Sequence, residues 1–229
     1  MADDVKARRG LTTERVVDAA LRAADERGLE AVSLRRLAEA LAVTPMAIYR
    51  HVRNKSHLLD LMAERLLEQV DLASDESATW QDRLRRLLAS YQAVIAAHPA
   101  APLLLSRPFV SPAVPRATEA LLAIFRSAGF DAAQSARVLA VISGMLLGPA
   151  IHRATWSAAS RDRPRDADRQ QASMEAWSAD DFPLWSAAQQ FVDWSAGADA
   201  DRLTIELLVG GLDALADQPN RGRAARRRR

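Results

Sequence analysis

The chain has 229 residues, of which 49% are apolar and 26% are charged, and its formal net charge is +2. This length accommodates one large domain or a small domain beside a larger one, and the apolar content supports a sizeable core. Because the chain contains no cysteine, disulfides, thiolate metal sites and thiol-based redox sensing are excluded.

The N-terminal sequence MADDVKARRG has no apolar run after its charged residues, so it does not predict a signal peptide. The longest apolar run, Val138 to Ile151, is too short to span a bilayer and is interrupted by Ser143. We therefore expect a soluble, cytoplasmic protein without a membrane partner.

The small net charge conceals an uneven distribution. Residues 1–65 hold 12 Lys and Arg against 10 Asp and Glu, whereas residues 66–220 hold 13 against 19, so the middle of the chain is not expected to contact DNA. Residues 1–10 predict a flexible basic arm, which either reaches a neighbouring DNA groove or is only a solvated terminus. Residues 219–229 predict a disordered, Arg-rich tail, which either binds nucleic acid nonspecifically or only aids solubility.

A first helix is predicted from about Thr12 to Gly28. Its apolar residues recur at spacings of three and four, as an amphipathic helix requires, and Gly28 is a typical helix stop. These residues are Val16, Val17, Ala20, Leu21 and Ala24.

The stretch from Ser33 to Lys55 predicts a helix, a tight turn and a second helix. Ser33 is a good N-cap, and the apolar residues after it fall on one face until the helix ends near Ala42. Thr44 then caps a second helix, Pro45 to Val52, in which proline takes the first position, where its missing N–H costs nothing. The side chains expected to point inward from this second helix are Ile48 and Val52.

The outer surface of this helix pair is cationic. No acidic residue occurs between Ala40 and Leu59, while Arg50, Arg53 and Lys55 each add a positive charge. Two short helices joined by a turn of three to four residues can place the second helix in a major groove. The alternative is an ordinary pair of packed helices, whose aromatic and His residues only pack or cap.

The segment AIYRHVRNKSHLLD, with the helices on either side of it, resembles the tetracycline-repressor (TetR) family of transcriptional regulators. The likeness is close over about the first 65 residues. It implies a three-helix DNA-binding domain in residues 11–57 and a connecting helix in residues 58–70. It also implies that Arg35 contacts a base edge and that His51 and Lys55 hold phosphates. The residues implied to face the groove are Thr44, Pro45, Met46, Ala47, Tyr49 and Arg50.

Beyond the polar break at Asp71 to Thr79, the pattern is that of a helical scaffold without strand signals, so the predicted fold class is all-α. Residues 71–218 are predicted to form a larger domain for effector binding and dimerisation. Five prolines between His98 and Arg116 limit that segment to short helices and turns, and Ser157 to Asp180 predicts a mobile loop. The expected helices are Trp80 to Ala97, Arg116 to Ala128, Ala132 to Trp156, Pro183 to Ser195 and Asp201 to Asp217.

Two of these helices are apolar on more than one face. They are Leu203 to Leu215, with Gly210 and Gly211 at its centre, and the segment RVLAVISGMLLGPAI. Each is either the buried core of one subunit or part of a four-helix interface in a homodimer, since a helix apolar on nearly all sides must be covered. A two-fold dimer places the second helix of the pair, Pro45 to Val52, of one subunit about 34–36 Å from that of the other. This spacing predicts a near-palindromic operator.

The C-terminal segments DFPLWSAAQQFVDW and RLTIELLVGGLDALAD are similar to the tetracycline-repressor branch, which implies a homodimer with a small-molecule pocket in each subunit. Alignment by eye places Val70, Leu87, Leu103 and His152 where those repressors contact drug and magnesium. This set cannot form an oxygen site for a hard cation, so we expect no metal, no cofactor and no response to magnesium-tetracycline.

We therefore expect a largely apolar effector with few polar groups. For each candidate pocket residue the alternative is ordinary core packing or, for Arg107, a surface or helix-end cation. A ligand carboxylate, Asp193 or water would each serve as partner to His152 and Arg153. The candidate lining residues are Tyr91, Leu104, Arg107, Phe109, Met145, His152, Trp156 and Trp185.

Three classes of function remain. The favoured one is a ligand-responsive repressor that binds a DNA operator as a homodimer and is released by a small molecule. The second is a ligand-independent activator or architectural DNA-binding protein. An enzyme has little support, because the chain has no Gly-rich phosphate loop, no nucleophile elbow, no HExxH motif and only four His.

Overall fold

The computed structural model describes residues 10–73, 75–162, 169, 172, 180–188 and 197–217, and the side chains of residues 156–162 and 198 are not among the described groups. The predicted Arg-rich tail and all of the predicted basic arm except Gly10 lie outside the described residues. Every regular element in the described part is a helix, as the sequence predicted.

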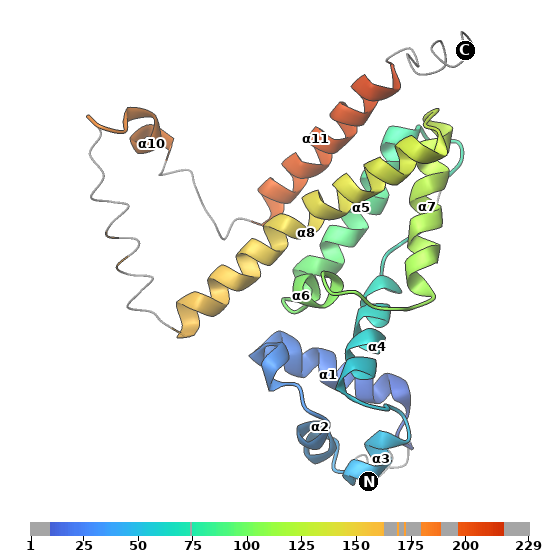
Figure 1. Ribbon diagram of the computed structural model, residues 1–229, viewed down its shortest axis with the longest axis vertical. Helices are drawn as coiled ribbons and strands as arrows, with labels where there is room; N and C mark the ends of the chain where they lie inside the picture. The colour runs from blue at the N-terminus through green and yellow to red at the C-terminus, as the bar shows by residue number, and fades with distance from the viewer. Residues whose placement is uncertain are drawn as a thin grey trace, which may run out of the picture.

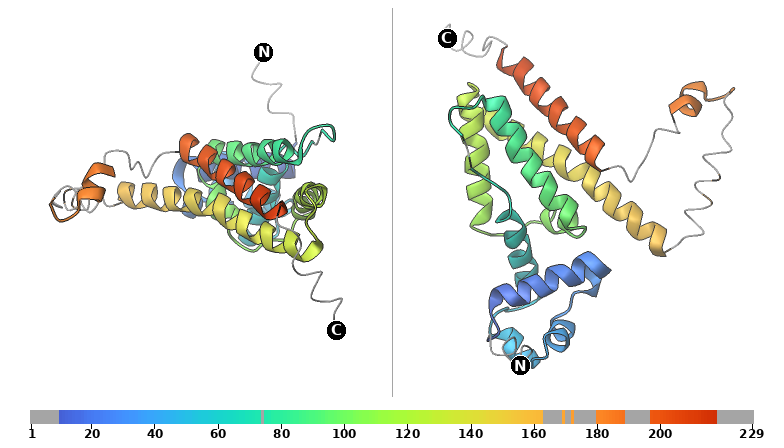
Figure 2. Two further views of the ribbon diagram at one scale, coloured as in Figure 1. Left: turned by 90° about the horizontal axis from the view of Figure 1, so that it is seen from above. Right: turned by 180° about the vertical axis from the view of Figure 1, so that it is seen from behind.

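A small group of helices forms one end of the molecule and α4 joins it to a larger helical body (Figure 1). The small group comprises α1 (Thr13–Arg27), η1 (Leu29–Ala31), α2 (Leu34–Ala40), α3 (Pro45–Tyr49) and the start of α4 (Lys55–Leu67). The body comprises α5 (Trp80–Ala97), α6 (Ala101–Leu105), α7 (Ala113–Ser127), α8 (Ala132–Asp162) and α11 (Ala198–Ala216). The short helix α10 (Pro183–Ala188) lies apart from the body in both views of Figure 2.

Side-chain caps explain where the helices of the small end begin. The hydroxyls of Ser33 and Thr44 accept hydrogen bonds from the backbone N–H three residues later, at 3.2 and 3.3 Å, and both predicted N-caps are confirmed. Asn54 caps α4 in the same way, because its Oδ1 accepts a hydrogen bond of 2.8 Å from the backbone nitrogen of His57. Each cap satisfies a backbone donor that the first helical turn leaves free.

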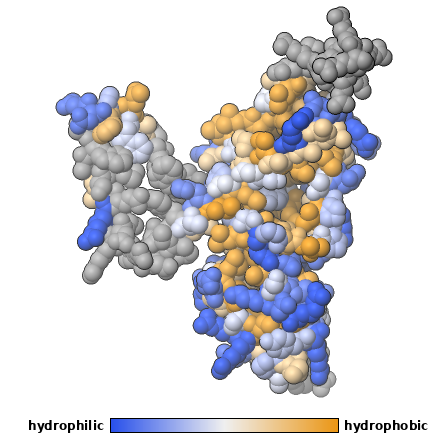
Figure 3. All heavy atoms as spheres, viewed as in Figure 1, coloured by the Kyte–Doolittle hydropathy of each residue, from blue (hydrophilic) through white to orange (hydrophobic). Residues whose placement is uncertain are grey.

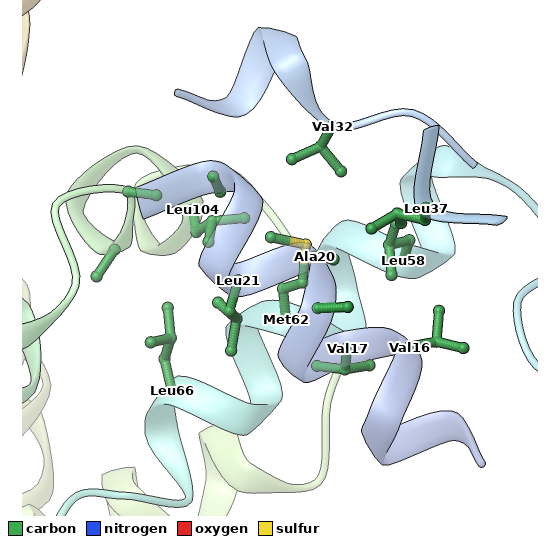
Figure 4. Packing of buried hydrophobic residues seen from close by; sticks show 14 of the residues in the cluster. Val16, Val17, Ala20, Leu21, Val32, Leu37, Leu58, Met62, Leu66 and Leu104 are labelled. Carbon is green, nitrogen blue, oxygen red and sulfur yellow. The ribbon is translucent and has the colours of Figure 1, made fainter. Parts of the chain in front are cut away.

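Buried apolar side chains form two clusters. The first, here called the interdomain cluster, packs the small end against α6, the last turn of α5 and Ala150 of α8, and Figure 4 shows Leu104 of α6 close to the side chains of α1 and α4. The second, the body cluster, lies between α5, α7, α8 and α11. The interdomain cluster is made of Val16, Val17, Ala19, Ala20, Leu21, Ala24, Val32, Leu37, Ala38, Ile48, Val52, Leu58, Met62, Leu66, Val70, Val94, Ile95, Ala100, Ala101, Leu104 and Ala150.

Several helix ends differ from the prediction. The second helix of the pair ends at Tyr49 rather than Val52, because the chain turns there and brings Val52 fully into the interdomain cluster. α7 begins at Ala113 instead of Arg116, since proline is tolerated in the first turn of a helix. α8 extends to Asp162, so the predicted loop from residue 157 begins with helix.

The two remaining helices also differ from the prediction. α11 spans Ala198–Ala216 rather than Asp201 to Asp217. α10 covers Pro183–Ala188, and the rest of its predicted range, residues 189–195, lies outside the described residues.

The turn between α2 and α3 contains a strained residue. Ala42 has φ = +54°, a left-handed conformation that costs a non-Gly residue about 1–2 kcal/mol. Around it, Val43 N donates to Ala38 O at 2.9 Å and Ala42 N donates to Glu39 O at 3.2 Å, which is the hydrogen-bond pattern of a Schellman helix end. The tight turn between α2 and α3 is therefore formed at a cost in backbone strain at Ala42.

We expect Ala42→Gly to raise the free energy of unfolding by about 1 kcal/mol, because glycine adopts this conformation without steric penalty. Urea denaturation followed by circular dichroism measures the change. Ala40→Gly, which places glycine in the right-handed last turn of α2, is the matched control and should lower stability by about 0.5–1 kcal/mol. An equal loss in both variants would contradict the strain at Ala42.

Candidate functional site

α3 presents its polar and long side chains to solvent at the end of the molecule. Ile48 is fully buried, whereas Met46 and Tyr49 on the opposite face are 68% and 51% exposed. Arg50 follows at the C-cap and is exposed, as is Lys55 at the start of α4. Within the described part of the chain neither cation forms an ion pair or hydrogen bond, so both are available to an anionic partner.

The other members of the predicted DNA-contact set lie on the same face or at its edge. Thr44 and Pro45 are exposed at the start of α3, and Ala47 is half-buried. Arg35 on α2 is exposed, with its Nε 3.2 Å from Glu39 Oε1. An exposed pair of this kind contributes little to stability, so Arg35 can exchange Glu39 for another partner at small cost. The nine predicted residues thus lie on α2, on α3, in the turns beside α3 or at the start of α4, and none of them is buried.

His51 is held in place by the first helix. Its Nδ1 lies 3.2 Å from Thr13 Oγ1, and the side chain is half-buried. This contact fixes the orientation of the ring, and Nε2 forms no hydrogen bond within the described part of the chain. The sequence pattern gave no sign of this link between α1 and the end of α3, because the two residues are 38 positions apart.

A half-open cavity of about 220 Å³ lies between the end of α4 and helices α5 to α8, and Val114 and Ser143 on its wall are exposed. No charged side chain lines it, and its polar groups come from Tyr91, Thr118 and Ser143. The lining residues are Leu67, Val70, Leu87, Leu88, Tyr91, Leu105, Phe109, Val114, Ala117, Thr118, Leu121, Ile142, Ser143, Leu146 and Leu147.

Two of the eight predicted pocket residues, Tyr91 and Phe109, line this cavity. Val70 and Leu87, which the alignment by eye placed at drug and metal positions, line it as well. The remaining lining residues occur at ordinary helical spacing. Such spacing predicts burial but does not distinguish a cavity wall from filled core, so the sequence offered no signal for them.

Five of the other predicted pocket residues lie elsewhere. Leu104 is fully buried in the interdomain cluster, and Met145 packs against the body cluster. Arg107 donates a hydrogen bond of 2.8 Å to Asp60 on α4, so it links the body to the small end. The last three are His152, exposed on α8; Trp185, on α10 apart from the body; and Trp156, whose side chain lies outside the described residues.

Tyr91 is the polar group with the most distinctive environment in the cavity. Burial raises the pKa of its hydroxyl to about 12, because desolvation disfavours the phenolate. The phenol is therefore neutral at physiological pH. Ser143 donates to Leu139 O at 2.9 Å, whereas the hydroxyls of Tyr91 and Thr118 form no hydrogen bond within the described part of the chain. Two neutral hydroxyl groups are thus available to a guest.

No group of three or more His, Asp or Glu among the described residues is arranged to hold a metal ion. The lining of the cavity is apolar apart from the hydroxyl groups of Tyr91, Thr118 and Ser143.

α8 and α11 carry a second, outward-facing apolar surface. On α11 the residues Ile205, Leu208, Val209 and Leu212 are buried, while Leu203 and Leu207 on the opposite side are about 60% exposed. Figure 3 shows apolar residues gathered on the upper body, where these helices lie. The exposed face, here called the α8–α11 face, consists of Val141, Gly144, Gly148, Leu203, Leu207, Gly210, Gly211 and Leu215.

By length and composition, residues Ala132–Thr155 of α8 would suffice to cross a membrane. The same helix packs against α6, α7 and α11. Its buried apolar side chains belong to the two clusters, and Arg153 on it pairs with Asp201 of α11 at 3.1 Å. These contacts make it an integral helix of the body.

Comparison with known proteins matches both parts of the chain. Residues 16–62 fit the family model for bacterial regulatory proteins of the tetR family, and residues 72–215 fit the model for the tetracyclin repressor-like C-terminal domain. The chain is 28% identical to an HTH-type transcriptional regulator of Saccharopolyspora erythraea, over 90% of this chain and 86% of the relative. It is 31% identical to the class A tetracycline repressor protein from transposon 1721 of Escherichia coli, over 86% and 88% of the two chains.

Among solved structures, ActR of Streptomyces coelicolor in complex with actinorhodin has the same fold, with a TM-score of 0.72 and 25% sequence identity. The match covers 92% of this chain and 99% of ActR.

Proposed function

Because this chain belongs to the tetR family of bacterial regulatory proteins, we propose that it is a ligand-responsive transcriptional repressor. In this proposal a homodimer occupies a near-palindromic DNA operator in the cytoplasm and leaves it when a small, largely apolar molecule binds. The observation that carries the proposal is the exposed, cationic face of α3 and the start of α4, together with an apolar cavity in the body of the same chain.

The role of each residue on DNA follows from its place on α2, on α3 or at the start of α4. Met46, Tyr49 and Arg50 on α3 enter the major groove, and Arg35 reaches a base edge from α2. His51, just beyond α3, and Lys55, at the start of α4, bind phosphates, and the Thr13 contact orients the His51 ring for this role. Thr44, Pro45 and Ala47 bring the start of α3 close to the DNA.

We expect different consequences from removing a phosphate contact and a base contact. Lys55→Ala should weaken binding to all duplexes similarly and reduce the salt slope by about one unit, whereas Arg35→Ala should relax preference at one base position. Equilibrium titrations at several salt concentrations, with the enriched duplex and single-base variants of it, measure both effects. Equal and sequence-independent losses for the two variants would remove Arg35 from the base-reading set.

The homodimer is supported by the α8–α11 face. Large apolar side chains stand exposed beside paired glycines, and the glycines leave open space where another helix can approach closely. A second copy of the same face covers these side chains and forms a four-helix interface. Two-fold symmetry then places two copies of α3 about one helical turn of DNA apart.

The effector is inferred from the cavity. A volume of about 220 Å³ is below the roughly 300–1,000 Å³ of pockets that hold drug-sized ligands. A small, uncharged, mainly apolar molecule with a hydroxyl or carbonyl group fits this lining, because Tyr91 and Thr118 offer neutral hydrogen-bonding partners. The structural relative ActR binds actinorhodin, which supports a small-molecule role for the equivalent domain here.

A ligand-independent activator or architectural protein would use the same DNA face without the cavity. Operator titrations in the presence of small aromatic alcohols and ketones distinguish the two functions. Release from DNA by one such compound, together with loss of release in a variant with a filled cavity, supports the ligand-responsive repressor. A folded dimer whose operator affinity no such compound changes would favour the ligand-independent function.

A further inference from the structure

The DNA-binding end contains a half-open cleft that is separate from the cavity in the body. This cleft, here called the α1–α2 cleft, lies between the second half of α1, η1 and α2, and its volume is about 560 Å³. Small-molecule sites typically have volumes of roughly 300–1,000 Å³. None of the described residues that line the cleft belongs to α3, α4 or the body, so a molecule could occupy it without entering either site discussed above.

The inner wall of the α1–α2 cleft is apolar. Val32 and Leu37 form its base and are almost completely buried, whereas Ala23, Ala31 and Leu41 are half-buried and keep part of their apolar surface accessible. Because an alanine side chain ends at Cβ, it leaves space between the helices that a longer side chain would fill. Such a wall favours the hydrocarbon part of a guest, since its contact removes apolar surface from water.

The outer edge of the cleft carries charged side chains from three arginines and two glutamates, all of them exposed. Both glutamates already have a cationic neighbour. Glu26 Oε2 lies 3.9 Å from Arg27 Nη2, and Glu39 Oε1 lies 3.2 Å from Nε of Arg35, which lies outside the cleft. The acidic groups at the edge are therefore balanced by neighbouring guanidinium groups.

Two of the arginines at the edge have no acidic partner in the described part of the chain. Arg22 on α1 forms neither an ion pair nor a side-chain hydrogen bond there. The guanidinium group of Arg36 on α2 donates one hydrogen bond, of 3.3 Å, to the backbone oxygen of Ala31 and forms no ion pair. The cleft thus combines an apolar wall with two guanidinium groups that are available to an anion.

We infer that the α1–α2 cleft binds a small organic anion, whose carboxylate or sulfonate pairs with Arg22 and Arg36 and whose hydrocarbon body packs against Ala23, Ala31 and Leu41. Guanidinium groups form strong, charge-assisted hydrogen bonds with such acids. DNA phosphates would satisfy the two cations but would leave the apolar wall unused. The site goes beyond the proposed function, because its ligand is charged whereas the cavity in the body suits an uncharged guest.

Octanoate is the probe that tests this site, because it combines one carboxylate with an apolar chain. Acetate supplies the charge without the chain, and 1-octanol supplies the chain without the charge. Backbone amide chemical shifts of the isotope-labelled, full-length protein, followed by NMR during titration with each compound, locate the compound and give its Kd.

We expect octanoate to shift the amide signals of Ala23, Ala31 and Leu41, and to bind there more tightly than acetate or 1-octanol. Arg22→Ala combined with Arg36→Ala should weaken octanoate binding at least about tenfold, because the carboxylate loses its charge-assisted hydrogen bonds. Both residues are exposed, and thermal melting checks that the variant folds. Arg126→Ala, on α7, is the charge control and should leave the Kd for octanoate unchanged.

A second variant fills the cleft and keeps both cations. Ala23→Met should also weaken octanoate binding about tenfold, whereas Ala123→Met, on the exposed side of α7, should not change it. If Ala23→Met does not fold, Ala40→Met, at an exposed position of the same cleft, takes its place.

Three results would each overturn the inference. They are shifts confined to amides around the cavity in the body, binding of acetate or 1-octanol in the cleft as tight as that of octanoate, and full octanoate binding by the folded Arg22→Ala, Arg36→Ala variant. The titrations contain no DNA, so their outcome does not depend on the proposed function.

Discussion

Leu207→Glu is expected to convert the protein to a monomer and to weaken operator binding on the order of 100-fold, because two linked reading helices bind far more tightly than one. Leu207 is 61% exposed on the α8–α11 face, next to Gly210 and Gly211. In a two-fold dimer the substitution buries two carboxylates against apolar side chains, at a cost that exceeds the gain from association. Analytical ultracentrifugation and titration of the enriched duplex measure the two effects.

The control for this variant is Val110→Glu. Val110 is 93% exposed in the connection between α6 and α7, so the substitution adds the same charge to an apolar position outside the α8–α11 face. It should leave the dimer intact. A dimeric Leu207→Glu protein with full operator affinity would show that another surface joins the subunits.

Tyr49→Ala combined with Lys55→Ala is expected to weaken operator binding by about 100-fold while the fold and the dimer remain intact. Tyr49 is half exposed on α3, and Lys55 has no partner in the described part of the chain, so neither substitution removes a contact that the fold requires. The loss combines a groove contact with a phosphate contact, at about tenfold each.

Fluorescence anisotropy with the enriched duplex gives the affinity, and thermal melting checks the fold. Arg126→Ala, an exposed cation in the last turn of α7 at the end of the body far from α3, is the charge control and should bind DNA like the wild type. An unchanged affinity in the double variant would remove this face from the DNA interface.

The DNA-binding end could be predicted from sequence because its signals are local. Ser33 and Thr44 predict where the two helices begin, and the structure confirms both N-caps. Ile48 and Val52 were predicted to point inward, and both are buried. The end of α3 was misplaced by three residues because the last apolar residue, Val52, is buried from a turn rather than from a helix. Periodicity alone does not separate these two cases.

The cavity and the links between the two ends could not be predicted in the same way. Whether Leu104 or Leu105 faces the cavity depends on how α6 packs against α4 and α8, and neighbours in sequence take opposite sides. Arg107 was proposed for an effector, but its nearest carboxylate comes from Asp60, 47 positions earlier. Contacts at such separations follow from tertiary packing and leave no mark in a local pattern.

The most direct test of the central claim is selection of bound sequences from a random duplex pool by the purified wild-type protein near physiological salt, with the Tyr49→Ala, Lys55→Ala variant in parallel. The account predicts enrichment of a near-palindrome whose half-sites lie about one helical turn apart, and loss of that enrichment in the variant. Folded, unliganded, dimeric protein that enriches no sequence, or a variant that enriches the same sequence equally well, would contradict it.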